Sequence, residues 1–251
     1  MTMNRRIFLF GVALPLAAQE AMPWKKGSGW KALFTGRDAR GWHGVDTESM
    51  KGASEWFTAA GARLDAGNTK ALSSVAAPGG VLLNGPKGKT VNLATDESFG
   101  DCELYLEFLV SQGSNSGVYL QGLYEIQVFD SYGVTDLKTS DCGAIYHRWI
   151  DGKPVGGSVP KVNACLKPGE WQSFHAWFRA PRFDTSGKKT ANARFERVLL
   201  NGKVVQENVS VEGGTRSHMP IVEAAKNPLM LQGDHGPVAF RNAWIRPLKP
   251  R

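Results

Sequence analysis

Apolar and polar residues alternate along much of the chain, and the alternation is clearest in the stretch NSGVYLQGLYEIQVFD. Successive side chains of a β-strand point to opposite faces of the sheet. In the second half of this stretch, Tyr124, Ile126 and Val128 therefore share one face. Glu125 and Gln127 share the other face, which puts a carboxylate and an amide side by side. The pattern predicts a strand with one apolar face and one polar face.

The residues before this strand predict its partner in a hairpin. We expect Gln121–Leu123 to form a three-residue loop. Tyr119 then lies opposite Glu125, and Gly117 lies opposite Gln127. A two-residue loop would mix apolar and polar side chains on each face, because a shift of one residue moves every side chain to the other face. The predicted polar face has a gap at its glycine and suits a polyhydroxylated ligand.

Short segments rich in Val, Leu, Phe, Tyr and Trp recur along the chain, and many of its 29 glycines and 13 prolines lie between them. No segment keeps a helical period for three turns, although Ser217–Lys226 has room for one helical turn. We predict a single all-β sandwich over residues 30–249 with long connecting loops. Its other strands are expected at Ala62–Asp65, Val91–Ala94, Cys102–Val110, Ala144–Tyr146, Trp171–Arg179, Phe195–Leu200, Lys203–Glu207, Leu229–Gln232 and Val238–Ile245.

The N-terminus has the pattern of an export signal. Arg5 and Arg6 precede the apolar run Ile7–Ala18, which is too short to span a bilayer and ends in small residues. The paired arginines resemble a bacterial twin-arginine signal. We expect residues 1–18 to be a signal peptide and residues 19–29 a linker. The mature protein would then be periplasmic or extracellular, with no membrane attachment after cleavage.

The formal net charge of +7 comes from basic residues that are scattered among apolar and acidic ones. A scattered charge of this size is typical of a soluble, mildly cationic surface. No nucleic-acid-binding motif accompanies it, so we expect no nucleic-acid partner.

The cysteines and tryptophans add expectations about packing. Cys102 alternates with apolar residues and is expected in the core, whereas Cys142 and Cys165 lie in loop-like sequence. In an oxidising compartment these two are the pair that we expect to form a disulfide. Alternating strand positions also predict core packing for three tryptophans, Trp171, Trp177 and Trp244. Three others either pin the N-terminal segment to the sandwich or stack on a sugar: Trp30, Trp42 and Trp56.

Several segments, taken in their order, resemble the 3-keto-disaccharide hydrolase domain family. The resemblance covers nearly the whole mature chain. Each piece alone is moderately specific, but their joint order is a strong signal. The matching pieces are WKALFTGRDARGW, FGDCELYLEF, NSGVYLQGLYEIQVFDS, CGAIY, KPGEWQ, APRFDTSGKK, LNGKVVQEN and LQGDHGPVAFRNAWIRPL.

The resemblance implies a concanavalin-A-like jelly roll of two antiparallel sheets with a ligand site on the concave one. It also implies a substrate class, glycosides oxidised to a ketone at C3 of the sugar. Such a ketone acidifies the C2 proton, so the glycosidic bond can break by elimination, and water then adds to the unsaturated sugar. This chemistry needs a base, a group that stabilises the enolate oxygen, and an acid for the leaving group.

Residues of the predicted polar face and of the C-terminal segment match these needs. Glu125 is the candidate base, and Gln127 could orient the substrate. His235 is a candidate acid or second base, because its ordinary pKa lies near neutrality. Arg241 falls on the opposite parity to Phe240 and would supply a fixed positive charge, provided that it does not simply pair with a sheet carboxylate.

Four further residues are candidates for substrate binding. By parity, Glu107 is expected to reach the same polar face. Asp234 could hold His235 or bind a cation, or it could simply belong to a polar loop. Tyr119 faces the candidate base across the hairpin. Asn115 either contacts the substrate or caps the Ser-Gly turn.

Two other functions stay open at this stage. A lectin-like binding module would use aromatic and amide contacts without a base, and fold alone does not decide between binding and catalysis. A retaining glycosidase needs two carboxyls about 5 Å apart; the neighbour of Glu125 on its face is the amide of Gln127, which disfavours this reading. The sequence indicates no organic cofactor. A divalent metal ion remains open, since Glu125, Asp234 and His235 offer ligand atoms without a recognisable spacing.

Overall fold

The computed structural model describes residues 22–34, 38–47 and 53–249, and within them almost all regular structure is β-strand. The one helix of this part is α1 (Pro23–Lys26). No helix among the described residues is long and apolar enough to cross a membrane. The predicted signal peptide at residues 1–18 lies outside the described residues.

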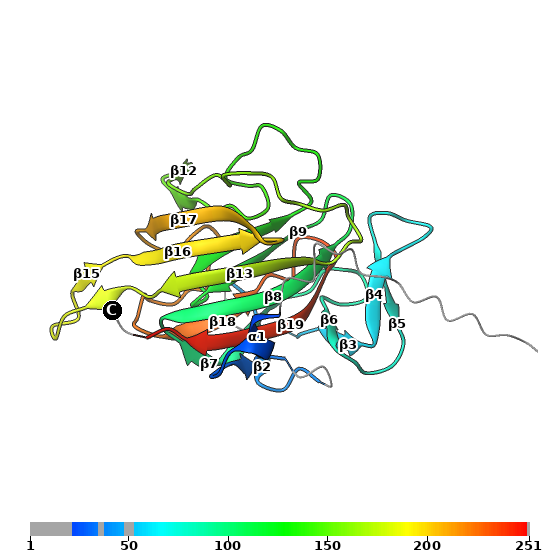
Figure 1. Ribbon diagram of the computed structural model, residues 1–251, viewed down its shortest axis with the longest axis horizontal. Helices are drawn as coiled ribbons and strands as arrows, with labels where there is room; N and C mark the ends of the chain where they lie inside the picture. The colour runs from blue at the N-terminus through cyan, green and yellow to red at the C-terminus, as the bar shows by residue number, and fades with distance from the viewer. Residues whose placement is uncertain (1–21, 35–37, 48–52, 250–251) are drawn as a thin grey trace, which may run out of the picture.

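The larger sheet has eight strands, and its central members stack across the front of the view in Figure 1. All of its pairs that have been assigned a register are antiparallel. The order of the strands across the sheet is β17 (Lys203–Val211), β16 (Ala193–Leu200), β13 (Gln172–Arg179), β8 (Cys102–Val110), β19 (Val238–Pro247), β6 (Val81–Leu83) and β3 (Phe57–Ala59). The short strand β1 (Lys31–Ala32) pairs with β19.

The smaller sheet has five antiparallel strands and lies behind the larger one in Figure 1. In order they are β10 (Tyr124–Phe129), β9 (Asn115–Leu120), β18 (Asn227–Leu231), β7 (Asn92–Phe99) and β2 (Trp42–Val45). Three two-stranded hairpins are separate from both sheets: β4 (Gly61–Leu64) with β5 (Leu72–Val75), β11 (Arg148–Ile150) with β12 (Lys153–Val155), and β14 (Arg182–Phe183) with β15 (Lys189–Ala191).

The main hydrophobic core lies between the two sheets. Alternate residues of β8 and β13, such as Leu106 and Phe174, enter it from the larger sheet. Val118 and Ile126 enter it from the smaller sheet. Burial of this apolar surface is the main force that holds the two sheets face to face. The predicted all-β jelly-roll sandwich is confirmed.

Most predicted strands are present, and the exceptions have local causes. Ala144–Tyr146 forms only isolated bridges, through Ile145 to Ile126 and Ser158. Ser217–Lys226, which has room for one helical turn, contains none and is irregular. Of the strands in the three added hairpins, β4 was predicted, at Ala62–Asp65. The other strands of these hairpins were not predicted, because two to four residues are too few to show an alternation.

The core position predicted for three tryptophans is wrong. Trp177 packs against His175 on the outer face of the larger sheet, with ring centroids 4.0 Å apart and the rings tilted by 33°. Trp244 stacks on Trp24 from the N-terminal segment, at 5.4 Å. The ladder between β19 and β8 shifts register before Trp244, where Asn242 has a left-handed φ of 50°, so the parity of β19 reverses within the strand. Trp171 packs against a small outer cluster and beneath the guanidinium of Arg241.

Of the two roles expected for the N-terminal tryptophans, packing against the sandwich is the one observed. Trp42 and Trp56 belong to the main core, and each donates its indole N–H to a backbone carbonyl at 2.7 Å. Trp30 lies against the guanidinium of Arg246 on the outer face of the larger sheet. None of the three lines the cavity described below.

Candidate functional site

The β9–β10 hairpin has the predicted register. Tyr119 pairs with Glu125, and Gly117 pairs with Gln127. The apolar partners of this hairpin face the core, so the polar set faces away from it. This polar face is not open to solvent, because loops cover it and leave Tyr119, Glu125 and Gln127 buried.

The glycine gap is filled by the carboxyl of Glu125. A Cβ atom added at Gly117 would collide with Glu125 Oε1 and with the ring of Tyr119. The side chain of Glu125 therefore lies against Gly117, which is its diagonal neighbour on the adjacent strand β9. Gly117 is needed for space, since its φ lies outside the left-handed region.

A cavity of about 160 Å³ opens over this face. Nearly every residue that lines it is polar, which is typical of a site for a hydroxyl-rich ligand rather than an apolar one. Among its lining residues the sole carboxylate is that of Glu125. The lining residues are Asn115, Tyr119, Glu125, Gln127, Tyr146, Arg216, Ser217, Gln232 and His235.

Burial is the main cause of the raised pKa of Glu125. Its exposed fraction is 2%. Desolvation has the largest effect on the pKa of this carboxyl; together with the lowering effect of the Tyr119 hydroxyl and the raising effect of the Asp234 charge, it brings the pKa from 4.5 to about 8. A carboxyl with a pKa near neutrality is able to accept and return a proton during a reaction.

His235 is held by its neighbour in the chain. Its Nδ1 lies 2.6 Å from Asp234 Oδ1. The hydrogen bond to Asp234 raises the pKa of His235 above its usual 6.5, although partial burial opposes this. With Nδ1 directed to the carboxylate, proton exchange with a ligand would run through Nε2.

Three amide oxygens around the cavity are buried without a hydrogen-bond partner. They are Asn115 Oδ1, Gln127 Oε1 and Gln232 Oε1. All three residues line the cavity. A buried acceptor without a donor costs free energy, and a ligand that brings hydroxyl donors removes that cost.

The loop that carries Arg216 and Ser217 was not identified as part of a site from the sequence. It is tied to the hairpin turn: the N–H of Thr215 donates to the Leu123 carbonyl at 2.8 Å, and the N–H of Met219 donates to the Gly122 carbonyl at 2.9 Å. The Tyr119 hydroxyl also donates to the Arg216 carbonyl, at 3.1 Å. The loop lacks any periodic pattern, so nothing in the sequence marks it.

Tyr146 and Gln232 were also not identified from the sequence. Tyr146 lies in the segment beside the edge strand β10, where its N–H donates to the Glu125 carbonyl at 3.2 Å. The N–H of Gln232 donates to the Gly117 carbonyl at 2.9 Å, just after β18. In both cases a backbone hydrogen bond to the β9–β10 hairpin fixes the residue at the cavity.

The expectation that Glu107 and Arg241 reach this face is wrong. Both lie in the larger sheet, where they are directly paired between β8 and β19. Arg241 Nε donates to Glu107 Oε2 at 2.5 Å, on the outer side of that sheet. The alternation along each strand correctly placed both side chains on the face that points away from the core. That face belongs to the larger sheet, however, and the core lies between it and Glu125. The alternative of a structural ion pair is therefore the one observed.

The described part of the chain holds no cluster of side chains that is typical of a metal centre. Among the described residues, no group of three or more His, Cys, Asp or Glu side chains is placed to hold a metal ion. Asp234 and His235 are paired with each other, and Asp234 does not line the cavity.

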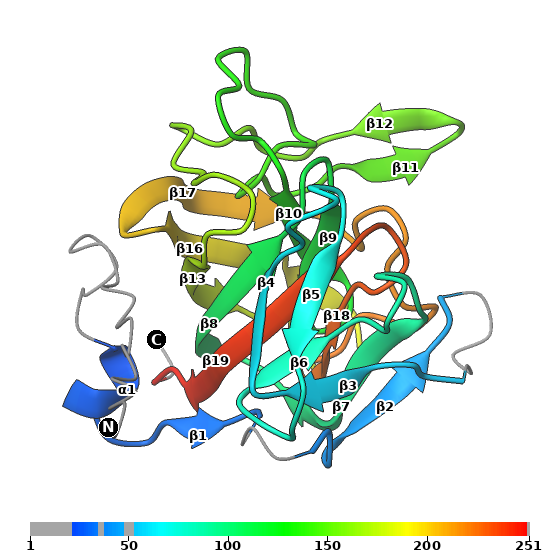
Figure 2. The ribbon, with the colours of Figure 1, turned by 90° about the vertical axis from the view of Figure 1, so that its right-hand side faces the viewer.

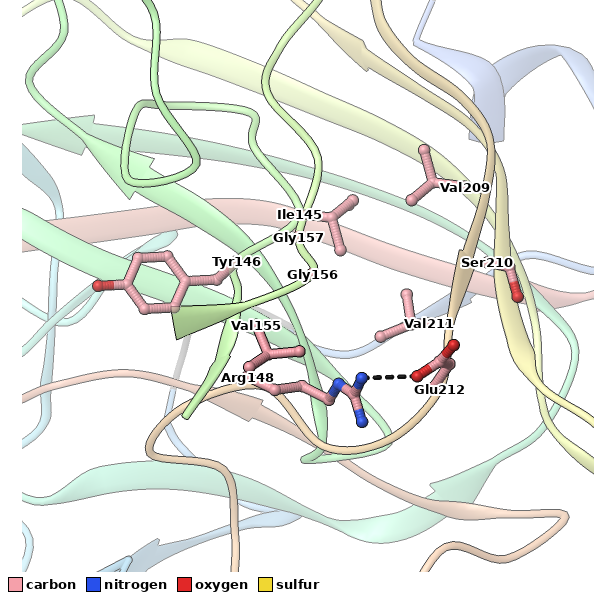
Figure 3. Close-up of a pocket in the computed structure, with 10 residues that line it drawn as sticks. All are labelled: Ile145, Tyr146, Arg148, Val155, Gly156, Gly157, Val209, Ser210, Val211 and Glu212. Carbon is pink, nitrogen blue, oxygen red and sulfur yellow. Dashed lines mark hydrogen bonds and ion pairs between the residues drawn. The ribbon is translucent and has the colours of Figure 1, made fainter. Parts of the chain in front are cut away.

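A second cavity of about 270 Å³ lies on the other side of the Tyr146 segment. Figure 3 shows its aliphatic lining and the ion pair of Arg148 with Glu212 at 2.6 Å. In the same view the ring of Tyr146 points away from the other lining side chains. The phenol of Tyr146 therefore belongs to the cavity of Glu125, and its backbone forms the wall between the two cavities.

Comparison with known proteins identifies the family. Residues 29–246 match the family described as 3-keto-alpha-glucoside-1,2-lyase-like domain. The protein belongs to this family. No protein of curated function matches this family member at a significant level.

Solved structures similar to this 3-keto-alpha-glucoside-1,2-lyase-like domain include candidate glycosyl hydrolases from Parabacteroides distasonis. One is 29% identical, with a TM-score of 0.62, covering 88% of this chain and 84% of that chain. Another is 17% identical, with a TM-score of 0.53 over 90% of this chain and 96% of that chain, and shows the shared fold. Family membership and these relatives support a carbohydrate-active function in general.

Proposed function

We propose that the protein cleaves 3-keto-glycosides by eliminating the leaving group across C1 and C2, after which water adds to the unsaturated sugar. The observation that carries this proposal is the Glu125 carboxyl, which is buried, has a pKa of about 8 and lines a polar cavity. Membership in a family described as 3-keto-alpha-glucoside-1,2-lyase-like supports the same reaction.

In the proposed reaction Glu125 takes the C2 proton, which the neighbouring ketone has made acidic. The electron pair of the C2–H bond forms an enolate, and its return forms the C1–C2 double bond as the C1–O bond breaks. The leaving alkoxide takes a proton and departs as an alcohol. Addition of water across the double bond, with hydroxyl at C1 and hydrogen at C2, then gives the free 3-keto sugar.

The other lining residues supply the remaining requirements. Arg216 and the phenol of Tyr146 offer a positive charge and a donor for the enolate oxygen at C3. His235, whose pKa Asp234 raises, is the acid for the leaving group. The unpartnered amide oxygens of Gln127 and Gln232 accept hydroxyl donors and so orient the sugar ring.

A retaining glycosidase is less well supported by this site. That mechanism requires a second carboxyl about 5 Å from the first. The residues lining the described cavity include one carboxylate, that of Glu125, which is flanked by amides and phenols. A single base beside polar donors suits elimination better than displacement.

The test is turnover of methyl α- and β-3-keto-glucosides in heavy water, followed by NMR. We expect the product sugar to carry deuterium at C2. The Glu125→Gln variant keeps the size and shape of the side chain but cannot act as the base, so we expect at least a hundredfold loss of kcat. Thermal unfolding should show that the variant is folded, and addition of a chelator should be included as a control for a metal ion.

Two outcomes would contradict the proposal. Full activity of Glu125→Gln would show that Glu125 is not the base. Binding of the keto-sugars by the wild-type protein without any turnover would favour a lectin-like module.

We also propose that the protein is exported, on the strength of its paired arginines and short apolar run. Replacement of both Arg5 and Arg6 by lysine should then leave the precursor in the cytoplasm, as measured by cell fractionation. Periplasmic delivery of the doubly substituted chain would contradict a twin-arginine route.

A further inference from the structure

We propose that Trp149, on the β11–β12 hairpin, forms with Arg216 a second sugar subsite that receives the leaving group of the substrate. This inference rests on the proposed function, because the first sugar ring is placed at Glu125. It names Trp149 as a residue that determines how the sugar of the leaving group is recognised.

The hairpin begins directly at the cavity. Tyr146 lines the cavity, and β11 starts two residues later at Arg148. Figure 2 shows the β11–β12 hairpin standing out from the body of the sandwich. A side chain on this hairpin is therefore placed outside the cavity but close to its opening.

A continuous row of rings leads outward from the cavity. The rings of Tyr146 and His147 are stacked with centroids 4.2 Å apart, and those of His147 and Trp149 are 6.0 Å apart. Arg216 links the cavity to the last ring of this row. It lines the cavity, and its guanidinium carbon lies 4.0 Å from the centroid of the Trp149 ring. One residue of the cavity wall thus touches the indole directly.

The exposure of Trp149 is unusual for a side chain of this kind. Its exposed fraction is 46%, while Trp42 and Trp56 are buried in the core. An exposed indole fixed by an arginine offers a flat apolar face at low entropic cost, and it keeps a polar edge toward water. Sugar rings present apolar C–H faces of matching shape, so a hexose fits this surface.

The size of the first cavity requires such a second surface. A volume of about 160 Å³ has room for roughly one sugar ring, so the leaving group of a glycoside must lie outside it. The second cavity does not serve this purpose, because the Tyr146 segment forms a wall between the two. Trp149 and Arg216 offer an exposed surface beside the opening.

The test compares two substrates in the full chain. One is a disaccharide with a 3-keto nonreducing glucose, of maltose or cellobiose type, and the other is the matching methyl 3-keto-glucoside. Trp149→Ala should lower kcat/KM for the disaccharide about tenfold or more, mainly through KM, and change it less than twofold for the methyl glycoside. Trp149→Tyr should restore most of the loss.

The neighbouring residue supplies a matched control. Ile150 is 40% exposed on the same strand and points to the opposite side of the hairpin. Ile150→Ala should leave both substrates unchanged. An equal loss on both substrates in Trp149→Ala would overturn the proposal, since it would show that the indole only positions Arg216.

A binding measurement separates this inference from the proposed reaction. If the wild-type protein turns over neither substrate, the proposed function fails. Calorimetry of the Glu125→Gln variant with the same two compounds still decides the subsite. Tighter binding of the disaccharide that is lost in Glu125→Gln/Trp149→Ala supports it, and equal affinities for the two compounds would overturn it.

Discussion

The acid–base behaviour of the site depends on Glu125 and on the Asp234–His235 pair. Burial, helped by the negative charge of Asp234, raises the pKa of Glu125 to about 8. The same carboxylate raises the pKa of His235. A base must be deprotonated and an acid protonated, so we expect kcat/KM to rise as Glu125 ionises and to fall again as His235 loses its proton.

The sign of this dependence can be tested with Asp234→Asn. The substitution removes a negative charge that raises both pKa values, so both limbs of the pH profile should move to lower pH. The check is kcat/KM measured from pH 5 to pH 10 for both proteins. Movement of either limb to higher pH would contradict the assignment of these groups. Lys89→Ala supplies a comparison of opposite sign for His235, because the positive charge of Lys89 lowers the pKa of this histidine.

Gly117 is the residue on which the position of Glu125 depends. In Gly117→Ala the new methyl group would occupy the place of the carboxyl, so Glu125 must move out of its buried position. We expect at least a tenfold loss of kcat and a lowered kinetic pKa, because a displaced carboxyl is better solvated. Gly80→Ala is the control, since nothing lies within 4 Å of a Cβ there. Unchanged activity in Gly117→Ala would show that this close contact is unimportant.

At the level of elements, the two sheets have separate roles. The smaller sheet carries the candidate site on its outer face, through β9, β10 and the residue that follows β18. The outer face of the larger sheet carries ion pairs and stacked aromatics that hold the N-terminal segment. Arg241 is therefore a structural residue, whereas Arg216 is the arginine of the site.

A comparison of these two arginines tests this division. Arg241→Ala leaves the buried Glu107 carboxylate without its ion-pair partner, so it should destabilise the fold by about 1–3 kcal/mol. At a temperature well below unfolding, its turnover should stay within about twofold of the wild type. Arg216→Ala should lower kcat more than tenfold. Denaturant unfolding and steady-state kinetics on the same samples decide the matter, and a reversed pattern would contradict the assignment.

The alternation of residues predicted strands and hairpin registers well where a segment was long. It determined the pairing of β9 with β10 because one face had to be buried. It gave the correct side for Glu107 and Arg241 but not the sheet to which they belong. In β19 a bulge at Asn242 reversed the parity before Trp244, and no feature of the pattern marks such a bulge.

At the level of the whole molecule, two free cysteines interact although they lie in segments next to different sheets. Cys142 lies beside β10, and the next residue, Gly143, donates its N–H to the Gln127 carbonyl at 2.8 Å. Cys165 precedes β13, where Asn201 Nδ2 holds the neighbouring Ala164 carbonyl at 2.8 Å. The thiols are free and interact with each other: burial raises the pKa of Cys142, and the hydrogen bond from Cys142 lowers the pKa of Cys165.

We therefore expect these two thiols to form a disulfide under oxidising conditions. Closure of a loop of roughly 20 residues should stabilise the fold by about 3 kcal/mol. Thiol titration of the unfolded protein should fall from three groups to one, which is Cys102 in the core. Cys165→Ser should show no stabilisation on oxidation. Three free thiols in the oxidised protein would contradict this expectation.

The sequence by itself determined the all-β fold, the hairpin of Glu125 and Gln127, and the family of the protein, because these depend on local alternation and on ordered motifs. Only the tertiary structure decided which arginine reaches the site, that the polar face is a buried cavity, and that Tyr146, Gln232 and Trp149 lie around it. The reason is physical. A strand pattern specifies which side chains share a face, whereas the irregular loops that cover that face are positioned by hydrogen bonds to distant backbone groups.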